Sequence, residues 1–353
     1  MINRLNRHCL SLILMFLTGW VCRAESTAAA TNRLTTLAPP TTARVFIAQD
    51  TEATRNFEPR ADRIQSLVDR AMNSLTAKST TRDAWLSLVS TQDTIGIKVF
   101  AEPGPNSGTR PAVVAAVVNG LIAAGIPTNH IIIWDRRLID LRLAGFVTLA
   151  KRLGVRAAGS SEAGYDEAQF YETALLGNLV WGDLEFGSKT PGVGRKSFVS
   201  KLLSQQITRI INITPLMNHN ETGVAGNLFS LALGSVDNVA RFESDPDRLA
   251  RAVPEIYALP ALGDRVVLNI VDALICQYEG EERSLLHYST SLNQLRFSRD
   301  PVALDVLSIK ELEDQRHANQ APAVKVNLDL YENAALLELG VSELKRIQLI
   351  TVP

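Results

Sequence analysis

Polar residues that follow a buried strand are the first candidates for chemistry in this chain. The apolar, β-branched run at residues 207–213 breaks at Pro215 into a loop that carries Asn218, His219 and Asn220. Open α/β sheets build ligand sites in this way, with a buried strand delivering polar side chains to its carboxyl end. A lone loop histidine is most often solvated, so His219 requires neighbours of suitable chemistry to make a site.

Asp135 and Asp272 have the same relation to apolar runs. They directly follow residues 131–134 and 266–271, which places both carboxylates near the carboxyl ends of expected strands. Each carboxylate could instead cap a following helix, and the two arginines after Asp135 offer it ion-pair partners. A site role and a structural role are therefore both open for each aspartate.

Lys98 and the loop after it form a further candidate. Lys98 has apolar neighbours on both sides, and a lysine inside a buried strand needs a partner or a purpose; burial would lower its pKa. Gly104 and Gly108 allow backbone amides to approach an anion, and Thr109 is expected to cap a helix with Pro111 in its first turn. No GxxxxGK[ST] or GxGxxG motif is present, so the loop taken alone is better explained as a turn.

Together these residues suggest an acid/base or metal site at one edge of a sheet. We expect Lys98, Asp135, His219 and Asp272 to carry any chemistry, with His219, Asp272 and Asp135 as the ligands if a divalent metal binds. No HxH or HExxH spacing accompanies them. A GxSxG nucleophile elbow and a cysteine–histidine pairing are also absent from the sequence, which disfavours a standard hydrolase.

The segment SRDPVALD predicts the start of a helix. Asp300 is the expected N-cap and Pro301 the first helical residue, and Asp300 either only caps the helix or also contacts a ligand. Asp305 lies between Leu304 and Val306 within this helix, where solvation is the simplest expectation.

Alternating strands and helices must position these residues. Near-continuous apolar strands are typical of parallel sheets that are buried on both faces. We therefore expect an α/β fold with a mostly parallel open sheet, helices on both faces and Rossmann-like layering. The expected strands are residues 44–48, 94–100, 130–134, 208–213, 265–271 and 347–352, and the expected helices are residues 60–75, 111–124, 139–153 and 301–313.

The amino terminus differs in composition from the rest of the chain. Basic residues precede an apolar run, and small residues stand before a cleavage position, so residues 1–24 are a predicted secretory signal peptide; a retained anchor is the alternative. Residues 25–42 are an expected flexible leader, and residues 43–353 a single α/β domain with a less regular insertion at about 155–200. The mature protein is then periplasmic or extracellular and has no membrane span.

Charge and cysteine content argue against some classes of protein. Residues 1–24 hold three arginines and no acid, so the mature chain has 33 basic and 37 acidic residues, a net charge of −4. This balance, without a basic stripe, argues against nucleic-acid binding. Cys276 is the one cysteine left after removal of the signal, which excludes an internal disulfide and a cysteine-ligated iron–sulfur cluster.

An ordered set of segments extends from about Thr94 to Arg316: GIKVF, IIIWDR, INITPLMNHNETGVAG, LGSVDN, LNIVDAL and SRDPVALD. In this set the chain resembles the domain-of-unknown-function 362 family. The resemblance implies an α/β fold, frequent export and, in some members, an attached ferredoxin-type cluster module, whereas the family's biochemical activity is largely unassigned. The chain departs from the family at Met217 and Phe229, where lysines are usual, and these replacements would make an electropositive site substantially apolar.

One function is suggested by the residues, a second by their departures from the family that the chain resembles, and a third by the resemblance alone. The first is an exported enzyme or enzyme-like protein that binds an anionic small molecule through Lys98, the 104–108 loop and His219. The second is a non-catalytic periplasmic binding protein whose site is remodelled by the apolar residues at 217 and 229. The third is an accessory component of an iron–sulfur electron-transfer system, which would require a partner protein to carry the cluster.

Overall fold

The computed structural model describes residues 42–188, 192–243 and 245–353. The predicted signal peptide, residues 1–24, and residues 25–41 of the predicted leader lie outside the described residues. Within the described ranges, no helix is both long enough and apolar enough to cross a membrane.

A mixed, mostly parallel sheet runs through the fold, which confirms the predicted α/β class. Its strands are β1 (Ala43–Gln49), β4 (Ile95–Val99), β5 (Ile131–Asp135), β6 (Arg156–Gly159), β9 (Arg209–His219), β10 (Gly223–Val224), β11 (Val266–Gln277), β12 (Ser289–Ser298) and β13 (Ile347–Val352). They follow the order β13-β1-β12-β11-β9-β4-β5-β6, and β10 pairs with β9. The neighbours from β11 to β6 are parallel, as are β1 and β13, whereas β12 runs antiparallel to both of its neighbours. A separate small hairpin joins β2 (Thr54–Arg55) to β3 (Glu58–Pro59).

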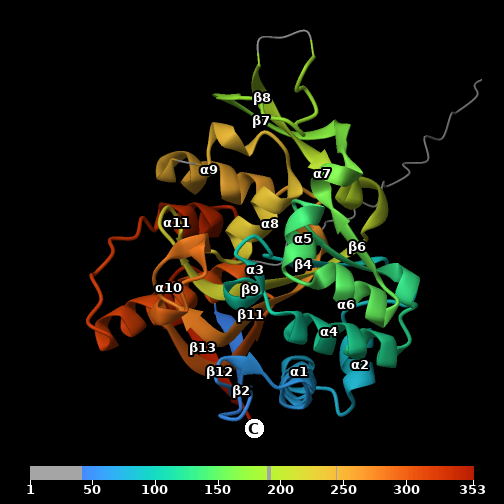
Figure 1. The fold of residues 1–353 in the computed structure, drawn as a ribbon, viewed down its shortest axis with the longest axis vertical. Coiled ribbons are helices and arrows are strands. Elements are labelled where there is room, and N and C mark those ends of the chain that lie inside the picture. The colour runs from blue at the N-terminus through green and yellow to red at the C-terminus, as the bar shows by residue number, and fades with distance from the viewer. Residues whose placement is uncertain (1–41, 189–191, 244) are drawn as a thin grey trace, which may run out of the picture. The chain divides into compact units, whose positions relative to one another are not determined.

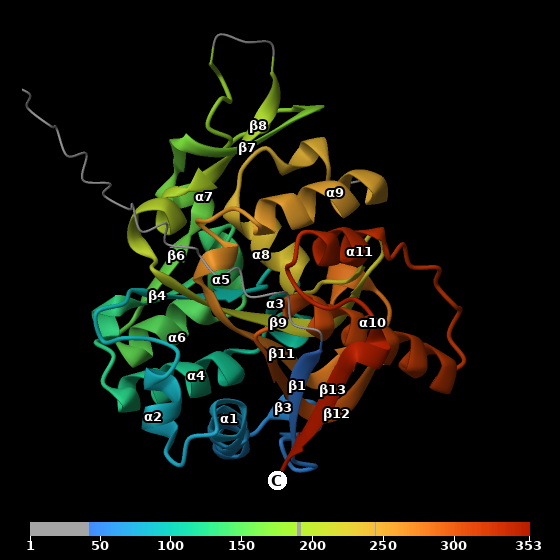
Figure 2. The same ribbon diagram turned by 180° about the vertical axis from the view of Figure 1, so that it is seen from behind.

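Helices cover both faces of the main sheet (Figures 1 and 2). The helices α1 (Ala61–Thr76), α2 (Thr81–Leu86), α4 (Pro111–Ala124) and α6 (Phe146–Leu153) share one hydrophobic core. The helices α8 (Asn227–Ser235), α9 (Pro246–Tyr257), α10 (Pro301–Ala318) and α11 (Asp329–Leu336) share the other. The sheet thus separates two cores, as the near-continuous apolar strands predict.

Side-chain alternation along β4 decides where Lys98 points. Ile95, Ile97 and Val99 pack into the core beneath α1 and α4. Because successive side chains of a strand point to opposite faces, Gly96 and Lys98 face the other core, which α8 covers. The alternation of side chains along β4 therefore directs the charged side chain of Lys98 into the apolar core beneath α8.

Two predicted regions differ in the structure. The predicted helix at residues 139–153 is two helices, α5 (Leu138–Leu143) and α6, because Gly145 between them has a φ of +87°, in the left-handed region that a right-handed helix cannot contain. The segment expected to be irregular contains β6, α7 (Ser160–Ala163) and a long antiparallel hairpin of β7 (Tyr165–Asn178) and β8 (Val193–Ser200). This hairpin is a separate two-stranded sheet that stands beyond α9 in both views (Figures 1 and 2).

Candidate functional site

A buried ion pair between Lys98 and Asp135 lies at the centre of the candidate site. The two residues come from the adjacent strands β4 and β5, and the Lys98 Nζ lies 2.8 Å from the Asp135 Oδ1. The ammonium also donates to the Ser230 Oγ at 2.9 Å and to the Val99 carbonyl oxygen at 2.6 Å, so each of its three protons has an acceptor. Burial lowers the pKa of Lys98, and the carboxylate of Asp135 opposes that shift.

Asp135 is held by backbone groups rather than by the arginines that follow it. Its Oδ2 accepts from the Ala101 N–H at 2.7 Å, and its Oδ1 accepts from the Arg136 N–H at 2.8 Å. The Arg136 guanidinium instead pairs with Glu243 at 3.3 Å. Asp135 therefore serves as the counter-ion of Lys98, with backbone donors that fix its orientation.

Helix α8 packs directly against this ion pair. Ser230 on α8 accepts from Lys98, and one turn later Gly234 passes so near that a Cβ there would lie 2.3 Å from the Lys98 Cε. The close approach of the helix to the lysine therefore favours glycine at this position, because any larger residue would displace the Lys98 side chain. Ser230 is a site residue that motif reasoning missed, because it carries no local signal within an apolar helix.

Asp305 positions the start of α8. Its Oδ1 accepts from the backbone N–H of Asn227 at 2.7 Å and from the Asn227 Nδ2 at 2.9 Å, and its Oδ2 accepts from the Leu228 N–H at 3.0 Å. Burial raises the pKa of Asp305 to about 6, and these hydrogen bonds oppose the shift. The expectation that Asp305 is solvated is wrong: it fills the role of an N-terminal cap contributed by another helix, α10.

Buried amides continue the polar layer under α8. Asn212 of β9 pairs in register with Lys98 on one side and with Asn269 of β11 on the other. Its Nδ2 donates to the Asn227 carbonyl oxygen at 2.9 Å, whereas its Oδ1 is buried without a hydrogen-bond partner among the described residues. Asn212 and Asn269 were visible in the sequence as amides inside apolar strands, which is the signal that could have identified them.

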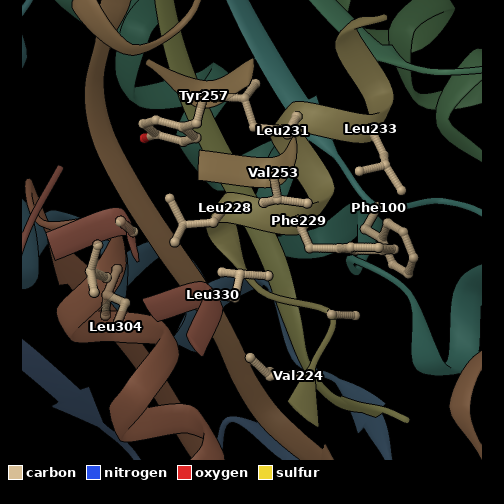
Figure 3. Packing of buried hydrophobic residues seen from close by; sticks show 14 of the residues in the cluster. Phe100, Val224, Leu228, Phe229, Leu231, Leu233, Val253, Tyr257, Leu304 and Leu330 are labelled. Carbon is tan, nitrogen blue, oxygen red and sulfur yellow. The ribbon is translucent and has the colours of Figure 1, made fainter. Parts of the chain in front are cut away.

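His219 packs on an aromatic side chain instead of joining the ion pair. The centroid of its ring lies 4.3 Å from that of Phe229, and the Phe229 centroid lies 6.3 Å from that of Phe100. Figure 3 shows the side chains of the two phenylalanines next to each other. The His219 Nδ1 accepts from the N–H groups of Glu221 and Thr222, both at 3.3 Å. Burial lowers the pKa of His219 to about 4, so the ring is neutral at physiological pH.

Asp272 has its own partner and lies apart from His219. Its Oδ1 lies 3.2 Å from the Arg110 Nη1, and its Oδ2 accepts from the backbone N–H of Arg110 at 3.0 Å. In the sheet Asp272 pairs with Pro215, four residues before His219 on the same strand, a separation of about 13 Å along an extended chain. Of the four residues expected to carry chemistry, the structure pairs Lys98 with Asp135. It does not bring His219 and Asp272 together, and no three His, Cys, Asp or Glu side chains of the described ranges gather into a metal site.

The glycine loop is closely packed at Gly108, whereas the space beside Gly104 is open. Gly104 begins the short helix α3 (Gly104–Ser107) with a φ of +79°, and a Cβ at Gly108 would lie 2.6 Å from the Phe100 carbonyl oxygen. Thr109 was expected to cap α4, but the N-cap is Arg110, which makes no side-chain cap. The Thr109 Oγ1 instead accepts from the Phe100 N–H at 2.9 Å and donates to the Ile213 carbonyl oxygen at 2.7 Å, joining β4 to β9.

The remaining expected ligand-binding residues also make structural contacts. The Asn218 Oδ1 accepts from the Glu281 N–H at 3.1 Å, and the Asn220 N–H donates to the Glu281 carboxylate at 2.8 Å. Asp300 is the N-cap of α10 as predicted, accepting from the Ala303 N–H at 2.8 Å. Because β12 is antiparallel to β11, Asp300 lies at the amino edge of the parallel strands, opposite the edge where Asp135 lies.

A narrow cleft of about 30 Å³, room for one water-sized group, lies beside the ion pair. Phe100, Phe229 and Leu233 make its apolar wall. Its charged lining consists of Glu102, Asp135, Arg136, Asp140 and Glu243. Burial raises the pKa of Glu102, and the neighbouring carboxylates add to the shift while Arg137, 2.7 Å away, opposes it.

Comparison with known proteins identifies the family of this chain. No curated protein matches the sequence. A protein from Thermotoga maritima of known crystal structure is 11% identical, with a TM-score of 0.38 over 74% of this chain and 60% of that one, so this chain spans less than two thirds of that protein's length. The sequence profile of the family described as domain of unknown function (DUF362) matches residues 95–310, which include Lys98, Asp135, Ser230 and Asp305. The chain therefore belongs to the DUF362 family.

Proposed function

We propose that this chain is a binding protein rather than a catalyst, and that the cleft beside Asp135 receives the ammonium group of a small organic cation. The observation that carries the proposal is an excess of negative charge around the cleft. Four carboxylates stand against three cations there: Glu102, Asp135, Asp140 and Glu243 against Lys98, Arg136 and Arg137. One further positive charge would neutralise the cluster.

The lysine expected to attract an anion is already neutralised. Lys98 is fully buried, and its charge and its three protons are taken up by Asp135, Ser230 and the Val99 carbonyl group. An anion entering the cleft would meet the carboxylate excess before it met Lys98. While Lys98 stays protonated as the partner of Asp135, its nitrogen cannot accept the hydroxyl proton of Ser230.

Apolar side chains lie beside the space for the ammonium group, where they would contact the methylene group next to it. The cleft volume of about 30 Å³ admits a group the size of a primary ammonium. Phe100 and Phe229 present aromatic rings, which attract cations, and Leu233 extends the apolar surface. The phenylalanine that replaces a usual family lysine thus contributes to a site for positive charge.

Three small molecules matched in carbon number test this proposal. We expect n-butylammonium to raise the melting temperature of the protein and to bind in titration calorimetry, whereas butyrate and butanol do neither. Glu243→Gln removes the excess carboxylate and should weaken n-butylammonium binding about fivefold or more. Glu343→Gln, a change to an exposed glutamate that pairs with Lys345 and Arg346, is the matched control. Preferential binding of butyrate, or equal n-butylammonium affinity in both variants, would show that the proposal is wrong.

We further propose that the protein acts after export from the cytoplasm. The support is the sequence of residues 1–24, in which basic residues, an apolar run and a small-residue cleavage position occur in signal-peptide order. Amino-terminal sequencing of the protein from a secretory host should begin at Glu25. A mature chain that still begins at Met1 would contradict cleavage.

A further inference from the structure

A cavity of about 490 Å³ lies at the amino edge of the parallel strands, opposite the edge where Asp135 lies. Its lining comes from β1, the carboxyl ends of α1 and α2, the junction of β12 with α10, and residues 338–340 after α11. The volume of this amino-edge cavity is within the range of small-molecule sites, about 300–1,000 Å³. The cavity shares no lining residue with the cleft proposed to receive an ammonium group.

Asp300 holds the walls of the amino-edge cavity together. Its Oδ1 accepts from the Ala303 N–H at 2.8 Å, and its Oδ2 accepts from the Val341 N–H at 2.9 Å. The Asp300 N–H donates to the Ser298 Oγ at 3.0 Å, and this hydroxyl donates to the Arg44 carbonyl oxygen at 2.8 Å. Because these bonds join β1, the start of α10 and the segment after α11, the cavity is formed before any ligand arrives.

Three charged side chains of the lining have no ion pair and no side-chain hydrogen bond among the described residues. They are Arg44, Arg299 and Glu338. The Arg44 guanidinium lies 5.0 Å from the centroid of the Phe46 ring, a contact that leaves the N–H groups at its edge without acceptors. Guanidinium groups are suited to hold a carboxylate, and a glutamate is suited to hold an ammonium.

The charges of the lining balance. With Asp300 included, two arginines stand against two carboxylates. A simple anion or a simple cation would be attracted by one half of this set and repelled by the other half. A ligand that carries one charge of each sign satisfies both halves. Beside the charged groups, Phe46, Leu75 and Leu339 supply apolar surface.

We infer that the amino-edge cavity binds an α-amino acid with an apolar side chain. Arg44 and Arg299 would hold its carboxylate, and Glu338 would hold its ammonium. Its side chain would contact the apolar part of the lining. This site is separate from the cleft beside Asp135 and does not depend on the function proposed for that cleft.

Three ligands that share one aromatic ring test this inference on the full chain. They are L-phenylalanine, 3-phenylpropionate, which lacks the ammonium, and 2-phenylethylammonium, which lacks the carboxylate. In titration calorimetry we expect L-phenylalanine to bind about fivefold or more tightly than 3-phenylpropionate. Any binding of 2-phenylethylammonium belongs to the cleft beside Asp135 and should be the same in all variants of the cavity. Absence of L-phenylalanine binding, or 3-phenylpropionate binding of equal affinity, would overturn the inference.

Single charge removals locate the binding. Arg299→Gln and Glu338→Gln should each weaken L-phenylalanine binding about fivefold. Arg152→Gln and Glu313→Gln are the matched controls, because both residues are exposed and form no ion pair among the described residues. The controls should bind L-phenylalanine as the unchanged protein does. Equal affinity in the cavity variants and the controls would refute the assignment of the site.

Ser87→Trp tests the cavity without a change in charge. Ser87 is exposed and lines the cavity, so an indole at this position would fill part of the space. We expect this variant to lose L-phenylalanine binding and to keep the affinity of the unchanged protein for n-butylammonium. Full L-phenylalanine binding by the variant would place the amino acid elsewhere and refute the inference, whatever the result for the cleft beside Asp135.

Discussion

Replacing Lys98 with methionine tests the buried ion pair at the centre of the site. Methionine has a similar length and no charge, so Asp135 loses its cation while its side chain stays only 7% exposed. Removing one partner of a buried ion pair typically costs about 3–5 kcal/mol. Asp135 keeps the N–H donors of Ala101 and Arg136, so we expect the lower end of that range, a loss of about 3 kcal/mol in the free energy of unfolding.

The converse change, Asp135→Asn, should cost less. Burial already lowers the pKa of Lys98, and without Asp135 the lysine can lose its proton instead of keeping an unpaired charge. The unfolded lysine then binds the proton more tightly than the folded one, so stability rises with pH and the cost of the variant shrinks toward alkaline pH. In the double variant the two costs should not add, with a coupling of about 2 kcal/mol.

Urea unfolding followed by circular dichroism measures all of these free energies. Lys345→Met is the matched control, since that lysine is 82% exposed in its side chain and its pair with Glu343 should contribute less than about 0.5 kcal/mol. Two results would refute the reasoning. One is a free energy of unfolding for Lys98→Met within about 1 kcal/mol of that of the unchanged protein, with the same slope against urea concentration. The other is a double variant in which the costs of Lys98→Met and Asp135→Asn simply add.

Three further changes test other contacts of the site. His219→Gln should remove the part of the destabilisation at acid pH that the low pKa of His219 causes. In the unchanged protein, as pH falls from about 6.5 to about 4, the unfolded state takes up the histidine proton before the folded state does, and the free energy of unfolding drops by about 3 kcal/mol. A variant with the same pH profile of urea unfolding as the unchanged protein would contradict this. Asp305→Ala should cost about 2–4 kcal/mol and speed amide exchange across α8, because three N–H donors of Asn227 and Leu228 lose their acceptor; protected α8 amides would refute the capping role. Gly234→Ala should lower stability by about 2 kcal/mol in thermal unfolding, since the added Cβ meets the Lys98 side chain, and a similar loss in a Lys98→Ala background would exclude that clash as its cause.

The sequence by itself predicted six strands of the main sheet and several helices, but it did not predict β6, β7 and β8 or the helices α8, α9 and α11. The predicted strands and the helix at residues 111–124 are present, and Asp300 caps α10, because apolar periodicity and capping depend on residues within a few positions of one another. The same local logic correctly placed Lys98 in a buried strand and Asp135 at the carboxyl end of the next strand along the chain. The break at Gly145 was missed, because the apolar pattern continues through it and a single glycine does not reveal the sign of its φ.

The tertiary structure alone decided which polar groups meet. Lys98 pairs with Asp135 because β4 lies beside β5, whereas Asp272, on a strand two places away from β4, pairs with Arg110. Ser230 lies in the site because α8 packs against the ion pair. The start of α8 is held by hydrogen bonds to Asp305, which belongs to a helix far along the chain. The physical reason is that burial makes an unpaired charge costly, so each charged group must find a partner, while the identity of that partner depends on strand order and helix packing, which no local pattern encodes.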